Sequence, residues 1–462
     1  MAKTFETPKG TRDFLPDEMR VRSAVFDRLR RAFQLFGFEE LDTPAFEYLE
    51  VLTLKAGPGA EREIYSFEDK GGRKLGLRFD LTSSTGRVMA AHPELKRPVY
   101  RYQIGKVWRY DRPAAGRYRE FYQADADIIG SHSMDCEVDL LLLATTVLAE
   151  FGLHDYSFVL NNRKILEAQV RKAGIPADKK ADALRALDKR DKIGLDGIRQ
   201  EALGYGIAAE PFNAFLGQLG LLEGQADLAG LAYLDHAAKG LQDDADGASG
   251  VEELRYIMTR AQGLGFADRV TIDPTLARGL DYYTGPIFEA KAHVERFGGK
   301  LSFAGGGRYD DLIGLYGGMQ QGAVGFSFGV ERLIELLKEQ AGDDLRAARP
   351  VLVAPLVFGG KRAEGTGSVG ESAERIAQSL RSQGIPARIG LAATAPGKHL
   401  QYAEAAGLDW IVFVGEDEVQ KGLYPLRQLS TRSEEKLTNE QLLERLRPLF
   451  VDHARTLTTR SA

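Results

Sequence analysis

The short alternating segments between residues 75 and 130 constrain the fold more than any other feature of the sequence. The runs KLGLRFDLT, VYRYQIGKVWRY and REFYQADADIIG alternate apolar with polar residues and are separated by Gly and Pro. Alternation with a period of two predicts β-strands, and the breaks between the runs predict the turns of an antiparallel sheet. Strand-like sequence with similar glycine breaks resumes at Val270 and continues to Phe328.

Helices are predicted to surround this sheet. Between Asp17 and Phe36, the apolar residues Val21, Val25, Leu29 and Phe33 recur every four residues, and a glycine follows. This spacing places the four side chains on one face of an amphipathic helix. Further predicted elements are a helix over Asp135–Phe151, a strand over Tyr156–Asn162 and a helix that begins near Val330.

The length of 462 residues predicts more than one domain, because single hydrophobic cores rarely organise so long a chain. Residues 165–260 are rich in Ala, Leu, Asp and Lys at helical spacing, which predicts a helical insertion. Strand and helix patterns alternate near the C-terminus and predict a small α/β domain with a mixed or parallel sheet. We therefore predict an α+β fold with a first core part (1–164), the insertion (165–260), a second core part (261–337), a linker (338–350) and a C-terminal domain (351–462).

Composition excludes several classes of protein. The net charge of −5 argues against coating of nucleic acid through overall charge, although a local basic patch remains possible. The single cysteine, Cys136, can form no disulfide within the chain and no Cys-based zinc site. The seven histidines form no ligand pair at metal spacing. Because the first residues lack an apolar signal segment and no apolar run could span a membrane, we expect a cytoplasmic protein.

One glycine motif suggests a different class of function. The string GTGSVG at residues 365–370 matches the pattern G-x-G-x-x-G of dinucleotide sites. Such a site needs its glycines directly after a strand, whereas GGKRAE intervenes here, and the next predicted strand ends without an acidic residue for a ribose. We interpret the string as a flexible glycine loop, and a nucleotide-dependent oxidoreductase is the less favoured alternative.

A locally cationic stretch stands out in this acidic chain. Between Lys96 and Arg119, basic residues interleave with tyrosines and Trp108, and the only acid is Asp111. Guanidinium groups beside aromatic faces suit a phosphate-bearing ligand with a planar ring. The alternative is a sheet with a solvated face of arginines, and this stretch alone does not decide between the two.

Polar residues on predicted strand faces favour a binding site. Gln123, Asp125 and Asp127 occupy alternate positions, so in a strand they share one face. Carboxylates are costly to bury without polar partners, so this face is exposed or lines a polar pocket. The three glycines of AGGGRYDDL indicate a close backbone approach or unusual dihedral angles. Further polar candidates are Asp80 and Thr82 in RFDLT, Arg278, Asp281, Tyr282 and Tyr283 in ARGLDYYTG, and Arg308 and Asp310 in AGGGRYDDL.

Together, these segments resemble the histidyl-tRNA synthetase family of class II aminoacyl-tRNA synthetases. FGFEELDTPAFEYLEVL resembles motif 1, which forms a dimer interface; VWRYDRPAAGRYREFYQ resembles motif 2; and AVGFSFGVERL resembles motif 3. ARGLDYYTG and AGGGRYDDL resemble two signatures peculiar to histidyl enzymes. The resemblance covers nearly the whole chain. It implies an antiparallel sheet with flanking helices, followed by a domain similar to the anticodon-binding domain of the family.

The resemblance also implies roles for individual residues. Arg109 and Arg278 would be catalytic, because their positive charges would offset the repulsion between a carboxylate and the α-phosphate of ATP. The ATP site would comprise Arg109, Asp111 and Arg332, and Mg²⁺ would accompany ATP, with no metal site assigned to side chains. The histidine site would comprise Asp80, Leu81, Thr82, Arg109, Gln123, Asp127, Arg278, Tyr282 and Tyr283.

The implied activity is ATP-dependent ligation of L-histidine to tRNA(His) through a histidyl-adenylate, carried out by a homodimer. A non-charging paralogue that acts as a regulatory subunit in histidine biosynthesis is the alternative. The intact ARGLDYYTG signature and the full C-terminal domain favour the ligase.

Overall fold

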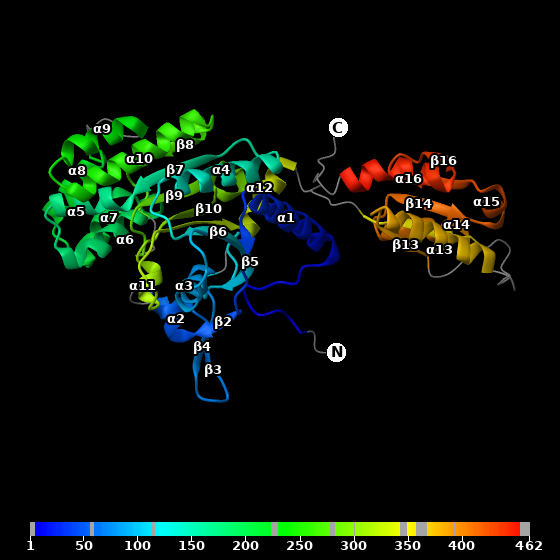
Figure 1. Ribbon diagram of the computed structural model, residues 1–462, viewed down its shortest axis with the longest axis horizontal. Helices are drawn as coiled ribbons and strands as arrows, with labels where there is room; N and C mark the ends of the chain where they lie inside the picture. Colours follow the sequence, from blue (N-terminus) through cyan, green and yellow to red (C-terminus); the bar gives the residue numbers. More distant parts are fainter. Residues whose placement is uncertain are drawn as a thin grey trace. The chain divides into compact units, whose positions relative to one another are not determined.

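The chain folds into two compact units, which comprise Met1–Asp13 with Val25–Gln340, and Phe14–Ala24 with Ala341–Ala462 (Figure 1). Among the described helices, none has the length and apolar character needed to cross a membrane. The computed structural model describes residues 5–55, 60–112, 116–222, 230–277, 282–299, 301–341, 349–356, 367–390 and 394–452.

The first unit is built on an eight-stranded sheet that joins the two strand-rich parts of the sequence. Neighbouring strands from β5 through to β7 are antiparallel, whereas the edge strands β1 and β8 pair in parallel. The predicted antiparallel sheet is therefore confirmed, except at its edges. In spatial order the strands are β1 (Glu39–Glu40), β5 (Val99–Trp108), β6 (Glu120–Ile129), β11 (Ala323–Gly329), β10 (Leu301–Arg308), β9 (Pro286–Ala292), β7 (Ser157–Asn162) and β8 (Val270–Ile272).

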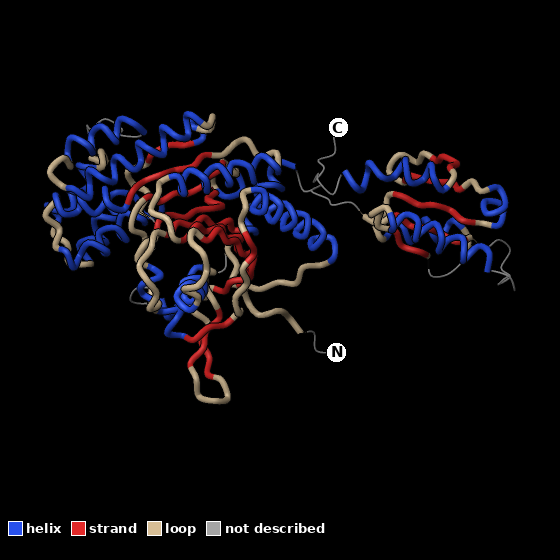
Figure 2. The backbone as a smooth tube through the Cα atoms, viewed as in Figure 1, coloured by secondary structure: helices blue, strands red, loops and turns tan. Residues whose placement is uncertain are grey.

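Helices cover one face of this sheet (Figure 2). Helix α1 (Pro16–Leu35) buries Val25, Leu29 and Phe33, and the Phe33 ring lies 5.1 Å from the ring of Tyr102 on β5. Helix α4 (Asp135–Glu150) packs against β6 and β11. The remaining elements of the sheet domain are α2 (Leu49–Thr53), α3 (Thr82–Ala91), α11 (Leu312–Leu315), α12 (Val330–Ala341) and a small sheet of β2 (Phe46–Tyr48), β4 (Lys74–Leu77) and β3 (Ser66–Glu68).

The insertion leaves the sheet after β7 and returns at β8, the strand paired with β7 at the sheet edge. Its helices form the green part of Figure 1. The predicted span of 165–260 differs slightly from the observed helices, because α5 already begins at Arg163 and α10 ends at Gly263. These helices are α5 (Arg163–Lys172), α6 (Lys180–Asp188), α7 (Arg190–Gly204), α8 (Ala209–Gln218), α9 (Gly230–Gly240) and α10 (Ala245–Gly263).

The second unit contains a mixed five-stranded sheet, as predicted. Strand β12 pairs in parallel with β13 and β14, and β14, β15 and β16 continue as antiparallel neighbours. The strands are β13 (Ala387–Ile389), β12 (Val351–Pro355), β14 (Trp410–Val414), β15 (Tyr424–Gln428) and β16 (Glu434–Leu437), and the helices are α13 (Gly367–Ser382), α14 (Pro396–Ala405), α15 (Glu416–Lys421) and α16 (Asn439–Arg447).

Two segment interpretations are corrected by the structure. Gly367–Gly370 of GTGSVG belongs to the first turn of α13, so this part of the string is not a loop; residues 365 and 366 lie outside the described residues. Helix α12 continues to Ala341, so the first residues of the predicted linker are helical. In both cases the helix extends beyond the residues whose apolar spacing was recognised, which is common at helix ends.

Close packing explains the run of three glycines in β10. A Cβ at Gly306 would lie 1.8 Å from the carbonyl oxygen of Gly325 on β11, and a Cβ at Gly307 would lie 2.7 Å from the carbonyl oxygen of Pro286. None of the three glycines has a positive φ. Gly306 and Gly307 therefore allow close approach between strands, which is the first of the two explanations that the sequence left open.

We predict that Gly306→Ala lowers the temperature of unfolding, because the added methyl group must push β10 away from β11. Overpacking of this kind costs about 1–3 kcal/mol. Gly204→Ala near the end of α7 is the control, since a Cβ there meets nothing within 4 Å and alanine favours the helix. Thermal unfolding measures both variants. Equal stability of Gly306→Ala and the wild type would contradict the close approach.

Candidate functional site

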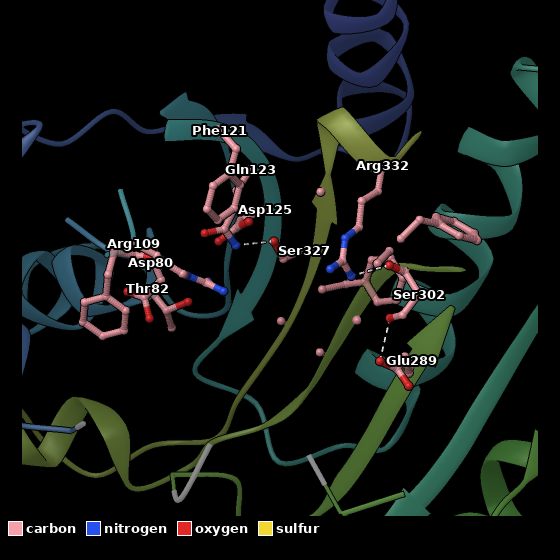
Figure 3. Close-up of a pocket in the computed structure, with 18 of the residues that line it drawn as sticks. Asp80, Thr82, Arg109, Phe121, Gln123, Asp125, Glu289, Ser302, Ser327 and Arg332 are labelled. Atoms are coloured by element: carbon pink, nitrogen blue, oxygen red, sulfur yellow. Dashed lines mark hydrogen bonds between the residues drawn. The ribbon is translucent and has the colours of Figure 1, made fainter. Parts of the chain in front are cut away.

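A cavity of about 670 Å³ opens on the polar face of the eight-stranded sheet (Figure 3). Its lining comes from the residues before and at the start of α3, from the segment between β5 and β6, from β6 itself, and from β9 to β11. Asp188 and Lys192, at the junction of α6 and α7 in the insertion, also line it. Of the residues predicted for the site, the lining includes Asp80, Thr82, Arg109, Asp111, Gln123, Asp127, Tyr282, Tyr283 and Arg332.

Two predicted site residues are not part of this lining. Leu81 is fully buried and does not face the cavity. It follows Asp80 in the chain and precedes α3, so its apolar side chain packs inward while its two neighbours line the cavity. Arg278 lies outside the described residues, as does Asp281.

Asp80 is held rigidly at the start of α3. Its Oδ1 accepts hydrogen bonds from the backbone N–H of Ser83 (3.0 Å) and from the Ser83 hydroxyl (2.9 Å). Its Oδ2 lies 2.7 Å from Nζ of Lys55. Burial alone would raise the pKa of Asp80, but Lys55 and Ser83 together hold this pKa below its ordinary value. Asp80 therefore presents a fixed carboxylate to the cavity.

Arg109 offers a cation on the same side of the cavity (Figure 3). Its Nε donates to the carbonyl oxygen of Phe79 at 3.0 Å, and the guanidinium carbon lies 5.2 Å from the ring of Phe121. Within the described part of the chain, no residue accepts a hydrogen bond from its two Nη groups. These two donors remain available to an anion, for which the planar guanidinium is well suited.

Asp111, the only acid of the cationic stretch, is paired at the rim of the cavity. Its Oδ2 accepts from Nε of Arg117 at 3.0 Å and lies 2.8 Å from Nη2 of the same residue. Both side chains line the cavity. The pair therefore adds little net charge there.

The polar face of β6 supplies three cavity residues at alternate positions, as the sequence predicted. Nε2 of Gln123 donates to the Ser327 hydroxyl on β11 at 2.7 Å, one of the contacts drawn in Figure 3. Asp127 lies opposite Arg101 on β5, with 2.5 Å between Oδ2 and Nη2. Asp127 also accepts a hydrogen bond from the hydroxyl of Tyr309.

Asp125 lies between Gln123 and Asp127 on this face, and its pKa is raised strongly. Burial, followed by the negative charge of Asp127, raises the pKa of Asp125 to about 7, although Arg101 opposes the shift. Burial also raises the pKa of Asp127, against the effect of Arg101 and Tyr309. The cavity floor thus holds two neighbouring carboxylates, and Asp125 gains or loses a proton near neutral pH.

Tyrosines form the wall beside these carboxylates. The rings of Tyr282 and Tyr283 lie 4.7 Å apart, and the ring of Tyr309 lies 5.9 Å from Tyr282. Nζ of Lys55 lies 4.2 Å from the centre of the Tyr282 ring. An aromatic wall beside fixed carboxylates is suited to a small planar cation or an N–H-bearing ring.

The opposite side of the cavity contains Arg332, near the start of α12 (Figure 3). Nη1 of Arg332 donates to the carbonyl oxygen of Ser302 at 2.7 Å, and the Ser302 hydroxyl donates to Glu289 at 2.6 Å. Across the described ranges, no group of three His, Cys, Asp or Glu residues is arranged to hold a metal ion.

Sequence reasoning missed several residues of the site. Asp125 was recognised on the polar face of β6 but was not included in the predicted site. Arg101 and Tyr309 could have been found as the partners that a buried Asp127 requires. Lys55 gave no signal, because the segment around it contains no recognisable pattern.

Arg308, singled out as a polar candidate, does not line the cavity. It is buried and forms a bidentate pair with the buried Glu137 of α4, with distances of 2.6 and 2.7 Å. Its Nη1 also contacts Asp310 at 3.1 Å. The pair ties the end of β10, and hence the adjacent Tyr309, to the helix that covers the sheet.

Comparison with known proteins relates the chain to one family. Residues 10–333 match the protein-family model described as histidyl-tRNA synthetase, and residues 350–449 match the model described as anticodon binding domain. The curated histidine–tRNA ligase of Bacteroides fragilis is 37% identical over 96% of this chain and 99% of its own length.

Solved structures agree with this relationship. The crystal structure of histidyl-tRNA synthetase from Nostoc sp. PCC 7120 superposes with a TM-score of 0.80 at 27% identity, covering 97% of this chain and all of that chain. A protein from Bacillus halodurans, described as an ATP phosphoribosyltransferase regulatory subunit/histidyl-tRNA synthetase, has a TM-score of 0.72 at 20% identity, covering 90% of this chain and all of that chain. At this identity, the second likeness shows a shared fold alone.

We predict that Asp125→Asn stabilises the folded protein at pH 8 more than at pH 5. The pKa of Asp125 is about 7 in the folded protein, against about 3.9 in an unfolded chain. Between these values the folded state binds more protons, so stability falls as the pH rises towards 7. Asparagine stays neutral and avoids this loss.

Thermal unfolding at the two pH values measures the effect, and Asp196→Asn, at an exposed position of α7, controls for the loss of one charge. If Asp125→Asn changed the temperature of unfolding by the same amount at both pH values, the raised pKa would be contradicted.

Proposed function

Since the chain belongs to the histidyl-tRNA synthetase family, we infer that it is a histidine–tRNA ligase. It uses ATP to join L-histidine to tRNA(His) through a histidyl-adenylate. The inference rests on a relationship that extends over almost the whole chain. The observation that carries it is that carboxylates, tyrosines and three arginines line one cavity.

We propose that histidine binds between Asp80 and the polar face of β6. The carboxylate of Asp80 and the hydroxyl of Thr82 suit an α-ammonium group, and Asp127 suits an N–H of the imidazole ring. Gln123 completes the polar surroundings, and Tyr282 and Tyr283 bound the ring. Such matched polar groups reject analogues that lack a hydrogen-bonding partner by roughly 10⁴–10⁵.

We propose that ATP occupies the part of the cavity between Arg109 and Arg332. The two free Nη donors of Arg109 would bind the α-phosphate, and Arg332 would lie against the adenine. Asp111 would accept a hydrogen bond from the nucleotide. Mg²⁺ would enter on the triphosphate, which would supply its oxygen ligands, and would stabilise the departing pyrophosphate.

Adenylation requires the carboxylate of histidine to attack the α-phosphate, although both groups are anions. A new O–P bond forms at phosphorus while the bond to pyrophosphate breaks. Arg109, and in our proposal Arg278, offset the repulsion with permanent charges, so the contribution of the protein is position and electrostatics. The attacking oxygen is already ionised, so this step needs no general base.

The second unit and the small sheet suggest how the protein meets its macromolecular partners. We propose that the second unit, which matches the anticodon-binding family, contacts tRNA through local cations and unstacked bases. We also propose a homodimer in the cytoplasm, where tRNA and ATP are available. Phe46, Tyr48 and Phe67 of the small sheet are large exposed side chains, as expected of a protein interface.

The regulatory paralogue is the less supported function. Its support is the fold shared with the protein from Bacillus halodurans, whereas curated ligases match nearly the full length at higher identity. A binding subunit would also have no need for cationic side chains placed to neutralise two anions.

Exchange of pyrophosphate into ATP, measured with each of the twenty amino acids, tests the proposed function. We expect exchange with histidine alone, because the cavity pairs an ammonium site with polar partners for an imidazole. Absence of exchange with every amino acid would favour the regulatory paralogue. Exchange with another amino acid would contradict the proposed pocket.

We predict that Arg109→Ala and Arg278→Ala each lower the rate of adenylation by about 10²–10³, the usual effect of removing one preorganised group that stabilises developing charge. Single-turnover formation of adenylate measures this rate. Arg260→Ala, which removes an exposed arginine paired with Asp135, is the matched control and should leave the rate unchanged. Loss of folded protein without a selective kinetic effect would identify a structural arginine instead.

A further inference from the structure

Lys55 is an ionisable residue of the cavity region to which the proposed function assigns no role. It follows α2, and its side chain is only 1% exposed. Its ammonium group lies 2.7 Å from Oδ2 of Asp80 and 4.2 Å from the centre of the Tyr282 ring. A lysine is rarely buried this completely, because removing its charge from water is costly unless a partner compensates.

The contacts of Asp80 show how its carboxylate is held and where a ligand could bind it. A carboxylate offers roughly four positions for hydrogen-bond donors. Ser83 occupies two at Oδ1, through its N–H and its hydroxyl, and Lys55 lies at Oδ2. Asp80 still lines the cavity, so its carboxylate can accept a further hydrogen bond from a ligand.

We propose that Lys55 is a positioning residue: it keeps the buried carboxylate of Asp80 ionised and oriented, so that Asp80 can bind the ammonium group of the amino acid. This proposal rests on the proposed function of the cavity. Lys55 acts through Asp80, so its removal should weaken binding of the amino acid and leave ATP binding unaffected.

The surroundings of Asp80 make this role necessary. Among the described residues, Asp125, Tyr282 and Tyr316 interact electrostatically with Asp80, as does Asp127. Neither carboxylate favours a further negative charge, and the cavity is partly shielded from water. Without Lys55, burial would raise the pKa of Asp80, which would then bind a proton in place of a substrate ammonium group.

The kinetic test compares Lys55→Met with the wild type in ATP–pyrophosphate exchange. We expect the KM for histidine to rise at least about 10-fold near pH 7, the loss expected when a buried charged partner is removed, with the KM for ATP within about twofold. The ratio of variant to wild-type KM for histidine should fall as the pH rises from about 6 to about 9, because Asp80 regains its charge.

Two further variants make this result specific. Lys55→Arg keeps a cation, so its KM for histidine should stay near that of the wild type at every pH. Lys180→Met removes a more exposed lysine that pairs with Glu167 at 2.8 Å in the insertion, and it should change neither KM. Equal increases in both KM values for Lys55→Met, or a histidine ratio that is independent of pH, would overturn the proposal.

A stability measurement tests the pair without relying on activity. Lys55→Met should lower the temperature of unfolding, and adding Asp80→Asn should restore part of it, because the buried charge is no longer unpaired. If Lys55→Met does not fold, the same second substitution should recover folded protein. Additive losses, or failure of this recovery, would overturn the proposal. If the wild type showed no ATP–pyrophosphate exchange with histidine, the proposed function would be refuted. The effect of Lys55 on Asp80 could still be measured by unfolding of the single and double variants.

Discussion

Compensation of buried negative charge is the constraint on which the site depends. The cavity places Asp80, Asp125 and Asp127 on or beside one polar face of a sheet, where water is scarce. Lys55 compensates Asp80, and Arg101 compensates Asp127, each through an ion pair buried in the protein. Burial, followed by the negative charge of Asp127, raises the pKa of Asp125 to about 7, although Arg101 opposes the shift. A positively charged group of a ligand would therefore be attracted to this group of carboxylates.

The sheet converts this electrostatic arrangement into fixed geometry. β6 carries the carboxylates between β5, which supplies Arg101, and β11, which supplies Ser327. Glycines let β10 approach β11 closely, and the buried pair of Arg308 and Glu137 fixes the end of β10 against α4. Tyr309 follows directly and reaches Asp127. Segments nearly two hundred residues apart in the chain thus hold one carboxylate in place.

Local patterns in the sequence predicted the elements of the fold better than the partners in the site. Alternation along β5 and β6 is a property of neighbouring residues, so the strands and the shared face of Gln123 and Asp127 could be predicted. The pairing of Lys55 with Asp80 depends on tertiary packing, and no spacing in the chain encodes it. Leu81 stays a predicted residue of the site on the strength of its motif, although its own side chain is buried in the core just before α3.

The insertion contributes to the border of the cavity, although the strands that form the cavity floor lie outside it. The chain leaves the sheet after β7 and rejoins it at the neighbouring edge strand β8, yet Asp188 and Lys192 from the insertion border the cavity. The strands that carry the chemistry are thus formed outside the intervening helices. A change in these helices would therefore alter the border of the cavity and also the packing behind Tyr283 and Tyr309, because both tyrosines share one hydrophobic core with the insertion.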